Sequence, residues 1–287
     1  MRLHRTEQPE RFCSGCLLHL GLTYIPRCAL RDFRSERTSR TSGTGESDLN
    51  LLKWLNRYFT KTEKLLWSGS VLLILCMFLL FDRENYLTLA ASLIGVTSLI
   101  FMAKAHPFGQ LLVILFSLLY GIISYSFAYY GEMLTYLGMT MPMAAFALVS
   151  WLRNPYQGNH AEVQVNHLRR WEYLLMAVLV GAVTVIFYFV LAYFHTANLI
   201  PSTVSVATSF GAAYLTFRRN PWYAAWYAAN DLVLIVLWIL AAMVDSMYLS
   251  VAVCFVAFLA NDLYGFINWR RIASRQSAQT DCGKGEM

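Results

Sequence analysis

Eight long apolar runs constrain the fold of this 287-residue chain more than any other feature. Each run is roughly 18 to 24 residues long, and at about 1.5 Å per residue a helix of that length crosses a hydrocarbon core of about 30 Å. Charged residues make up only 14% of the sequence, against about 25% in soluble domains. The predicted fold class is all-α integral membrane, with eight transmembrane helices near 64–81, 86–103, 108–130, 133–152, 171–194, 198–217, 221–243 and 247–269.

Charged residues in the short loops predict how these helices are oriented. One side of the membrane receives Lys53, Arg57, Lys61, Lys64, Lys104, Arg153, Arg169, Arg170, Arg218, Arg219, Arg270, Arg271 and Arg275. The other side receives Arg83, Glu132, His195 and Asp245. Because basic loops remain in the cytoplasm, both termini are expected there. This topology also explains the net charge of +6, so no nucleic-acid partner is predicted.

Two segments occur twice and define an internal repeat. Residues 104–108 return 114 residues later as 218–222, and each copy carries a proline in the first turn of the next helix. The Trp-Leu-Arg at 151–153 returns 118 residues later as Trp-Arg-Arg. These segments place repeat one, a three-helix bundle, at 86–153 and repeat two, a second three-helix bundle, at 198–271, with a linker helix at 171–194.

The linker helix gives both repeats the same orientation in the membrane. Three helices and one linker shift the second copy by an even number of crossings, which predicts parallel repeats related by an axis along the membrane normal. Residues 51–82 are expected to form an amphipathic lead-in and an extra transmembrane helix, and residues 272–287 a cytoplasmic tail. Pro142 lies inside a predicted span, where it is expected to kink the helix or loosen one backbone bond.

Residues 1–50 differ in composition from the rest of the chain. Arg, Ser, Thr and Gly dominate, which predicts a disordered extension that is either dispensable or an incorrectly assigned start. Cys13, Cys16, His19 and Cys28 lack the spacing of a zinc site. No metal or cofactor is therefore predicted.

The helix that begins at 221 carries the strongest functional signal. Trp222, Trp226 and Asn230 recur every fourth residue and share one face, and Tyr227 and Asp231 lie on the adjoining face. Asp231 is about 15 Å into the helix, near the bilayer midplane. An ionisable side chain at that depth predicts a functional site.

The last span repeats this combination of polar and aromatic residues. Asn261 and Asp262 could bind a ligand or could bond to Asn230 and Asp231 between helices, and both roles stay open. Repeat one is poorer in polar groups. The candidate substrate-binding residues are Trp222, Trp226, Tyr227, Asn230, Asp231, Asn261, Asp262, Tyr264, Gln110 and Tyr120.

These residue types suit a flat heterocycle that carries a sugar. Aromatic rings stack on the base, while amide and carboxylate groups accept hydrogen bonds from hydroxyls. A cationic base would add cation–π attraction, and Asp231 would offset its charge. A phosphorylated ligand fits less well, because no Arg or Lys lies deep in a predicted span.

Other functional classes find less support in the sequence. A membrane enzyme would need an acid–base or metal constellation, and the intramembrane candidates are only Asp231 and Asp262. A primary pump would need a nucleotide-binding motif, which the sequence lacks. Transport without catalysis is therefore predicted, and a proton-coupled carrier remains open because Asp231 could load a proton with the substrate.

Over about residues 60–272 the sequence resembles the PnuC family of bacterial vitamin and nucleoside transporters. The resemblance rests on Asn-Pro-Trp at 220–222, on the Trp- and Tyr-rich helix that follows, and on the Tyr-Gly-Phe-x-x-Trp motif at 264–269. It implies a fold like that of the SWEET transporters and a ligand bound through Trp222, Trp226 and Asn230. The two tryptophans stand four residues apart instead of the family's usual three, and repeat one lacks the polar residues expected around 137–147.

The resemblance also implies a function. Family members carry nicotinamide riboside, historically described as the mononucleotide, by facilitated diffusion, and a cytoplasmic kinase traps the substrate by phosphorylation. The implied location is the bacterial inner membrane, and the implied assembly is a homotrimer. Relatives of the same design carry deoxynucleosides, thiamine or riboflavin, so these substrates remain alternatives.

Overall fold

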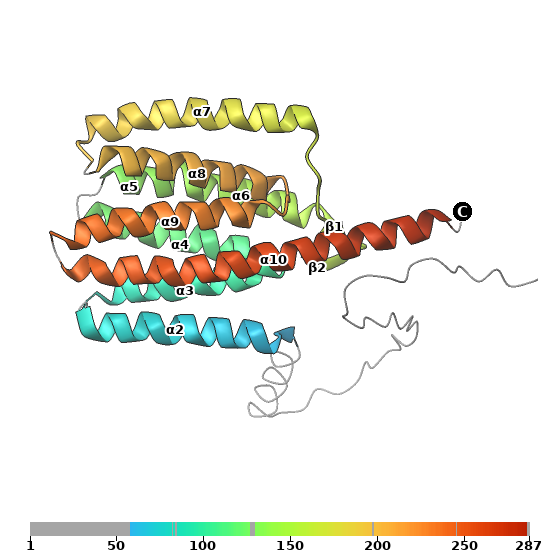
Figure 1. Ribbon diagram of the computed structural model, residues 1–287, viewed down its shortest axis with the longest axis horizontal. Coiled ribbons are helices and arrows are strands. Elements are labelled where there is room, and N and C mark those ends of the chain that lie inside the picture. The colour runs from blue at the N-terminus through green and yellow to red at the C-terminus, as the bar shows by residue number, and fades with distance from the viewer. Residues whose placement is uncertain are drawn as a thin grey trace, which may run out of the picture. The chain divides into compact units, whose positions relative to one another are not determined.

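The computed structural model describes residues 58–81, 83, 85–126, 130–196, 198–244 and 246–285 (Figure 1). The helices are α2 (Lys61–Phe81), α3 (Tyr86–Ala103), α4 (Phe108–Ser126), α5 (Tyr130–Leu134), the π-helix η1 (Thr135–Thr140), α6 (Met141–Leu152), α7 (Arg170–Tyr193), α8 (Leu199–Phe217), α9 (Tyr223–Ala242), the 3-10 helix η2 (Ser246–Tyr248) and α10 (Leu249–Gly285). Strands β1 (Pro155–Tyr156) and β2 (Asn159–Val163) form an antiparallel hairpin. The predicted extension at 1–50, with its cysteines and His19, lies outside the described residues, as do Lys53, Arg57 and Asp245.

The prediction of a helical membrane protein is confirmed. Among the described residues, seven helical segments are long and apolar enough to cross a membrane. The predicted span that is not among these seven is 198–217, which forms α8, has more hydroxyl residues and does not reach the same hydropathy. Ten of its 19 residues are buried, so neighbouring helices cover much of its surface.

Two features at the end of the bundle where α10 extends beyond the other helices were not predicted. The hairpin of β1 and β2 follows α6, and α10 continues without a break past residue 269 to Gly285 (Figure 1). The two features contact each other, because Gln276 of α10 accepts a hydrogen bond from the Val165 N–H (2.8 Å) and donates one to the Val163 carbonyl (3.1 Å). The extension of α10 therefore holds the segment that connects the two repeats.

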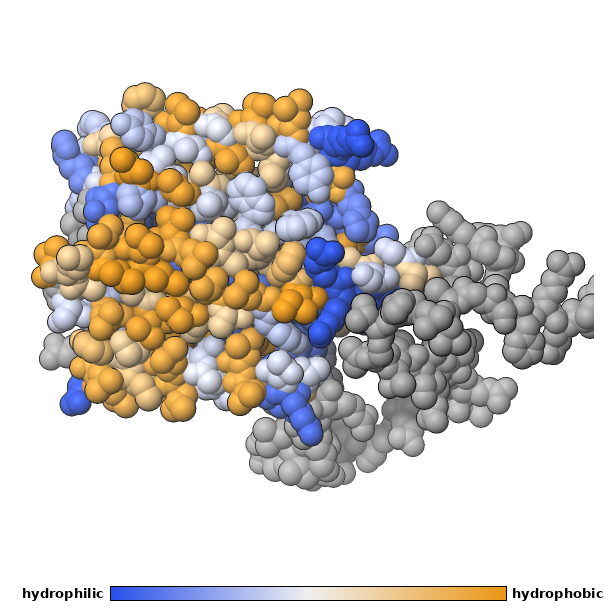
Figure 2. All heavy atoms as spheres, viewed as in Figure 1, coloured by the Kyte–Doolittle hydropathy of each residue, from blue (hydrophilic) through white to orange (hydrophobic). Residues whose placement is uncertain are grey.

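Six helical segments pack in a closed ring around the centre of the bundle. In order of contact these are α3, α4, α6, α8, α9 and α10, and α10 returns to α3. Outside the ring, α2 packs on α3 and α10, and α7 packs on α8 (Figure 1). The two outer helices expose most of their apolar side chains, as in Leu72, Leu80, Leu174 and Phe189. Such surfaces suit lipid, and Figure 2 shows hydrophobic residues over much of the described helical surface.

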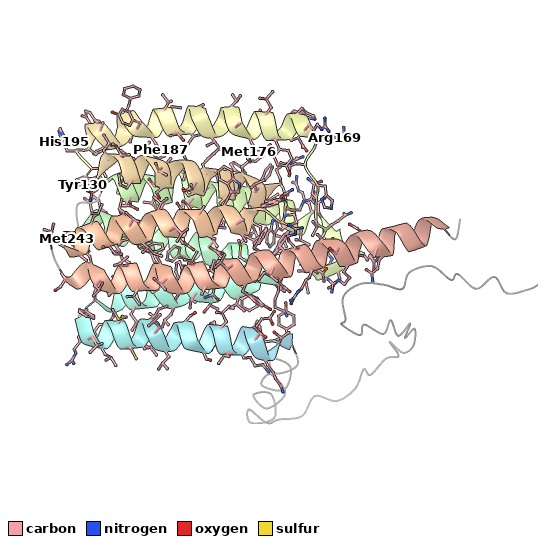
Figure 3. All side chains as sticks on the ribbon, in the orientation of Figure 1. Tyr130, Arg169, Met176, Phe187, His195 and Met243 are labelled. Carbon is pink, nitrogen blue, oxygen red and sulfur yellow. The ribbon has the colours of Figure 1, made fainter. Side chains whose placement is uncertain are left out.

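The two ends of the bundle differ in charge. Figure 3 shows Arg169 at one end of α7 and His195 at the other, with Tyr130 and Met243 near His195. Figure 2 shows hydrophilic residues gathered at the end where Arg169 lies. Lys104 and Arg218 cap α3 and α8 at that same end, which we call the basic side.

The repeated segments 104–108 and 218–222 have the same backbone structure. Ala105 (φ 56°) and Arg219 (φ 58°) both adopt the left-handed conformation just after a helix. In each copy the N–H groups of this residue and of the next close a Schellman motif on α3 or α8. The side chain that follows then caps the next helix, because His106 Nδ1 accepts from the Phe108 N–H (3.1 Å) and Asn220 Oδ1 accepts from the Trp222 N–H (3.0 Å).

Two tryptophans link each repeat to the end of the first helix of the other repeat. Trp151 Nε1 donates to the Thr216 carbonyl (2.9 Å), and Trp269 Nε1 donates to the Met102 carbonyl (2.7 Å). Met102 and Thr216 are equivalent positions, 114 residues apart. The two indole rings are fully buried and their centroids lie 5.4 Å apart. We call this pair of reciprocal contacts the tryptophan clasp.

Neighbouring polar groups repeat the reciprocal pattern. Ser150 Oγ donates to the Phe217 carbonyl (2.9 Å), and Asn268 Nδ2 donates to the Ala103 carbonyl (2.8 Å). Ser150 precedes Trp151 as Asn268 precedes Trp269. Each repeat is therefore held to the other by two side-chain hydrogen bonds of the same kind.

Helices α2 and α7 make matching ion pairs with the ends of the first helix of each repeat. Glu63, in the first turn of α2, lies 3.2 Å from Nζ of Lys104. Glu172, in the first turn of α7, pairs with Arg218. Lys104 and Arg218 are again equivalent positions. The helix that precedes each repeat is therefore attached to it in the same way.

The histidine in the first repeated segment predicts a pH-dependent stability. Burial and the nearby charge of Lys104 lower the pKa of His106 below its ordinary value, which favours the neutral ring that caps α4. The unfolded chain then binds the proton first as pH falls below about 6.5, so this contribution to stability is complete above that pH and is lost below it. His106→Asn, copied from Asn220, should keep the cap and flatten the fall in melting temperature between about pH 6.5 and 5. Equal falls in both proteins would contradict this origin.

Candidate functional site

A polar cavity lies at the centre of the six-helix ring. Its polar lining comes from both repeats and consists of Ser98, Glu132, Thr135, Tyr136, Thr140, Ser205, Ser209, Tyr227, Asn230, Asp231 and Asp262. Its volume is about 90 Å³. Since one water needs roughly 10–15 Å³, the cavity has room for several waters and exceeds an ordinary packing void. We call it the central cavity.

Helix α9 supplies one continuous stripe of the lining. Tyr227, Asn230, Asp231 and Leu234 follow the i, i+3, i+4, i+7 spacing that places residues on one helical face. Asn230 and Asp231 are buried, with exposed fractions of 6% and 4%. The sequence placed Asn230 and Asp231 on adjoining faces of this helix, and in the structure both side chains lie deep in the bundle and line the same cavity.

Two hydroxyl groups of α8 orient the Asn230 amide. Its Oδ1 accepts hydrogen bonds from Ser205 Oγ (3.2 Å) and Thr208 Oγ1 (2.8 Å). Both bonds use the carbonyl end of the amide, so the NH₂ end remains to donate to a ligand in the central cavity. This geometry suits a hydroxyl or carbonyl oxygen of a bound molecule.

Three carboxyl groups line the central cavity, from Glu132, Asp231 and Asp262. The Asp231 and Asp262 side chains contact each other, and Asp231 Oδ2 is buried without a hydrogen-bond partner in the described part of the chain. The described lining contains no Lys, Arg or His. Within the described residues, no three acidic, His or Cys side chains converge as metal ligands would. The electrostatics of the site therefore favour a cationic ligand.

A π-helical turn shapes the repeat-one wall of the cavity. In η1 the Met141 N–H donates to the Tyr136 carbonyl, five residues back, and Thr140 Oγ1 donates to the Thr135 carbonyl (3.2 Å). Pro142 follows directly and has no N–H, so it cannot support an ordinary turn here. The wide turn carries Thr135, Tyr136 and Thr140 to the lining. Turns of this kind are frequent at functional sites.

The two predicted tryptophans lie away from the central cavity. Trp222 is 49% exposed at the start of α9, with its ring 5.2 Å from that of Phe266 and 5.8 Å from the Arg270 guanidinium. Trp226 packs against α8, at a point where only Gly211 leaves room for its ring. Neither tryptophan is among the residues that line the cavity.

The predicted residues outside α9 divide in the same way. Asp262 lines the central cavity, but Asn261 faces α2, where its Nδ2 donates to Ser70 Oγ (2.9 Å). The Tyr264 hydroxyl donates to Glu63 Oε1 (3.0 Å), also on α2. Gln110 Nε2 contacts the Met102 sulfur (2.8 Å), and Tyr120 lines a second cavity.

Several lining residues were not predicted. From repeat one these include the polar groups Glu132, Thr135, Tyr136 and Thr140. The first three lie just before the segment 137–147, in which no such groups were predicted, and Thr140 lies within it. Their spacing of 3, 1 and 4 residues is helical and could have identified them. Glu132 was assigned to a loop, but α5 begins two residues earlier, at Tyr130. Ser205 and Ser209 of α8 were also missed.

Comparison with known proteins agrees with this architecture. Residues 85–271 match the family model described as nicotinamide mononucleotide transporter. The chain belongs to this family. Membership in the nicotinamide mononucleotide transporter family makes the protein a multi-pass membrane transporter and confirms the resemblance stated from its motifs.

Two individual proteins of known name are also similar to this chain. The nicotinamide riboside transporter PnuC of Neisseria mucosa is 27% identical over 222 residues, which is 74% of this chain and 82% of the relative. The crystal structure of the vitamin B3 transporter PnuC aligns with a TM-score of 0.66 at 23% identity, covering 76% of this chain and 94% of that one. The fold is therefore shared with a solved transporter.

Proposed function

We propose that this chain carries nicotinamide riboside across the membrane without altering it chemically. The observation that supports this most directly is the composition of the central cavity, where three carboxyl groups stand without a basic residue in the described lining. The nicotinamide ring of the riboside is a cation, and its sugar hydroxyls suit the Asn230 amide and the nearby serines. A 5′-phosphate would bring negative charge against Asp231 and Asp262.

Thiamine is the second candidate substrate, because its thiazolium ring is also a cation. The same carboxyl groups give no comparable advantage to deoxynucleosides or riboflavin, which are neutral. The curated relative is named for nicotinamide riboside, which supports placing thiamine second.

The two halves of the bundle, in this proposal, are parallel repeats related by an axis that passes between Trp151 and Trp269. The reciprocal hydrogen bonds of the tryptophan clasp support this arrangement, since each bond has an equivalent in the other half. The matched ion pairs support including α2 and α7, each as the leading helix of the repeat that follows. We further propose that the basic side and both termini face the bacterial cytoplasm.

Transport is proposed to be facilitated diffusion, with a cytoplasmic kinase that makes uptake one-way. In proteoliposomes, internal riboside should then rise to the external concentration and no further, with or without an imposed pH gradient. Accumulation above the external concentration under an inward proton gradient would show proton coupling, with Asp231 as the first residue to test. The assembly of three chains remains a prediction that the size of the purified protein in detergent would test.

A further inference from the structure

A second cavity, the outer cavity, lies on the side of the bundle opposite the basic side. It is enclosed by the ends of α2, α4 and α9 and by the beginnings of α3 and α10, and its volume is about 80 Å³. Asn85, the N-cap of α3, and Tyr248, the last residue of η2 before α10, show that the cavity lies close to this end of the bundle. The function proposed for the central cavity assigns no role to this outer cavity.

The outer cavity is chemically suited to an uncharged polar or an aromatic ligand. Trp238 and Tyr248 present rings whose centroids lie 5.6 Å apart at 37°. Hydroxyl and amide groups stand beside them, and Thr88 Oγ1 is buried without a hydrogen-bond partner among the described residues. The described lining carries no charged side chain. A lipid chain would need no hydroxyl or amide groups here.

Three phenylalanines form the wall between the two cavities. Phe116, Phe255 and Phe258 line both of them. The ring of Phe258 lies 6.1 Å from that of Phe116 and 5.6 Å from that of Phe255, in edge-to-face contacts. Gly95 gives the wall its room, because a Cβ at this position would lie 2.7 Å from the Phe258 ring. The two cavities therefore share a wall of three aromatic side chains.

We propose that the outer cavity is a second binding site for the transported ligand, an aromatic heterocycle bearing a sugar, which waits there before it passes the three phenylalanines. The site rests on the proposed function for the identity of its ligand. Its rings and hydroxyls match the stacking and hydrogen-bonding groups of a nucleoside. Its lack of charge makes it a weaker site for a cation than the central cavity, so the ligand moves from the outer cavity toward the three carboxyl groups.

Cysteine protection by nicotinamide riboside tests the proposal. Ser250 lines the outer cavity and Ser209 lines the central cavity. Ser250→Cys and Ser209→Cys would be made separately in full-length protein whose six native cysteines are replaced. A small membrane-impermeant thiol reagent is then added with and without the riboside. Ser246→Cys, which is exposed and lines neither cavity, is the matched control, and Ser92→Cys replaces Ser250→Cys if that variant does not fold.

We expect the riboside to slow modification of Ser250→Cys several-fold and to leave modification of Ser246→Cys unchanged. The riboside should still slow modification of Ser250→Cys in the Asn230→Ala background, in which binding to the central cavity is weakened. Protection of Ser209→Cys alone, or loss of Ser250→Cys protection in the Asn230→Ala background, would overturn the second site while the proposed function stands. A Ser250→Cys that the reagent never reaches would also overturn it. Protection at neither position would count against both proposals.

Discussion

Trp269→Ala should lower the free energy of unfolding by about 3–5 kcal/mol, the cost of truncating a large, fully buried aromatic side chain. Trp269 is fully buried, packs against Trp151 and donates its Nε1–H to the Met102 carbonyl across the repeat boundary. Trp269→Phe retains most of the apolar volume and removes only the donor, so it should cost about 1–3 kcal/mol. Thermal unfolding in detergent would rank the three proteins.

Trp67→Ala is the matched control for the tryptophan clasp. Trp67 also donates a side-chain hydrogen bond, to Thr97 Oγ1 (3.1 Å), but it is 41% exposed on α2. Its truncation should cost less than about 1 kcal/mol, because surface substitutions rarely cost more. If Trp269→Phe melted at the wild-type temperature, the bonds of the clasp would not hold the repeats together.

Asn230→Ala should weaken riboside binding by a factor of at least about 10, which corresponds to about 1.4 kcal/mol. The physical reason is the position of the amide, whose oxygen is held by Ser205 and Thr208 while the residue lines the central cavity. The melting temperature should change little, because the two hydroxyls can bond to waters in the cavity once the amide is removed.

Asn261→Ala is the matched control for Asn230→Ala, and it should change stability instead of ligand affinity. Asn261 is buried to 1% exposure and ties α10 to Ser70 of α2, outside the central cavity. Its loss should lower the melting temperature and leave riboside affinity unchanged. Calorimetry and thermal unfolding on both variants would separate the two roles. Equal affinities in Asn230→Ala and wild type would remove Asn230 from the site.

The helices could be predicted from the sequence because apolar length and loop charge act locally. The segment at 86–103 was predicted to the residue, and α8 and α9 to within two residues at either end. The π-helical turn before Pro142 could not be predicted in detail, because it depends on how the chain packs against its neighbours. The hairpin of β1 and β2 is equally non-local, since Gln276 of α10 holds the segment that follows it.

The site was predictable where depth and helical spacing decide which side chains face the cavity. Tyr227, Asn230, Asp231 and Asp262 follow from that geometry and line the central cavity. Trp222 was predicted from its motif, and in this structure it lies at a helix start beside Phe266. The direction of a side chain near a helix end depends on the neighbouring helix, and periodicity within one helix does not supply it.

The repeat shows the same division between local and tertiary information. The similarity of 104–108 to 218–222 predicted two equivalent turns, and both turns have the same backbone conformation. The reciprocal bonds of Trp151 and Trp269 join segments 65 and 167 residues apart, so only the folded bundle reveals them.

Calorimetric titration of the purified protein with nicotinamide riboside and with its 5′-phosphate tests the central claim most directly. The three carboxyl groups of the central cavity and the lack of a basic residue in its described lining predict that the riboside binds and that the mononucleotide binds at least about 10-fold more weakly. Tighter binding of the mononucleotide, or binding of neither, would contradict the account of an acidic site for a cationic riboside.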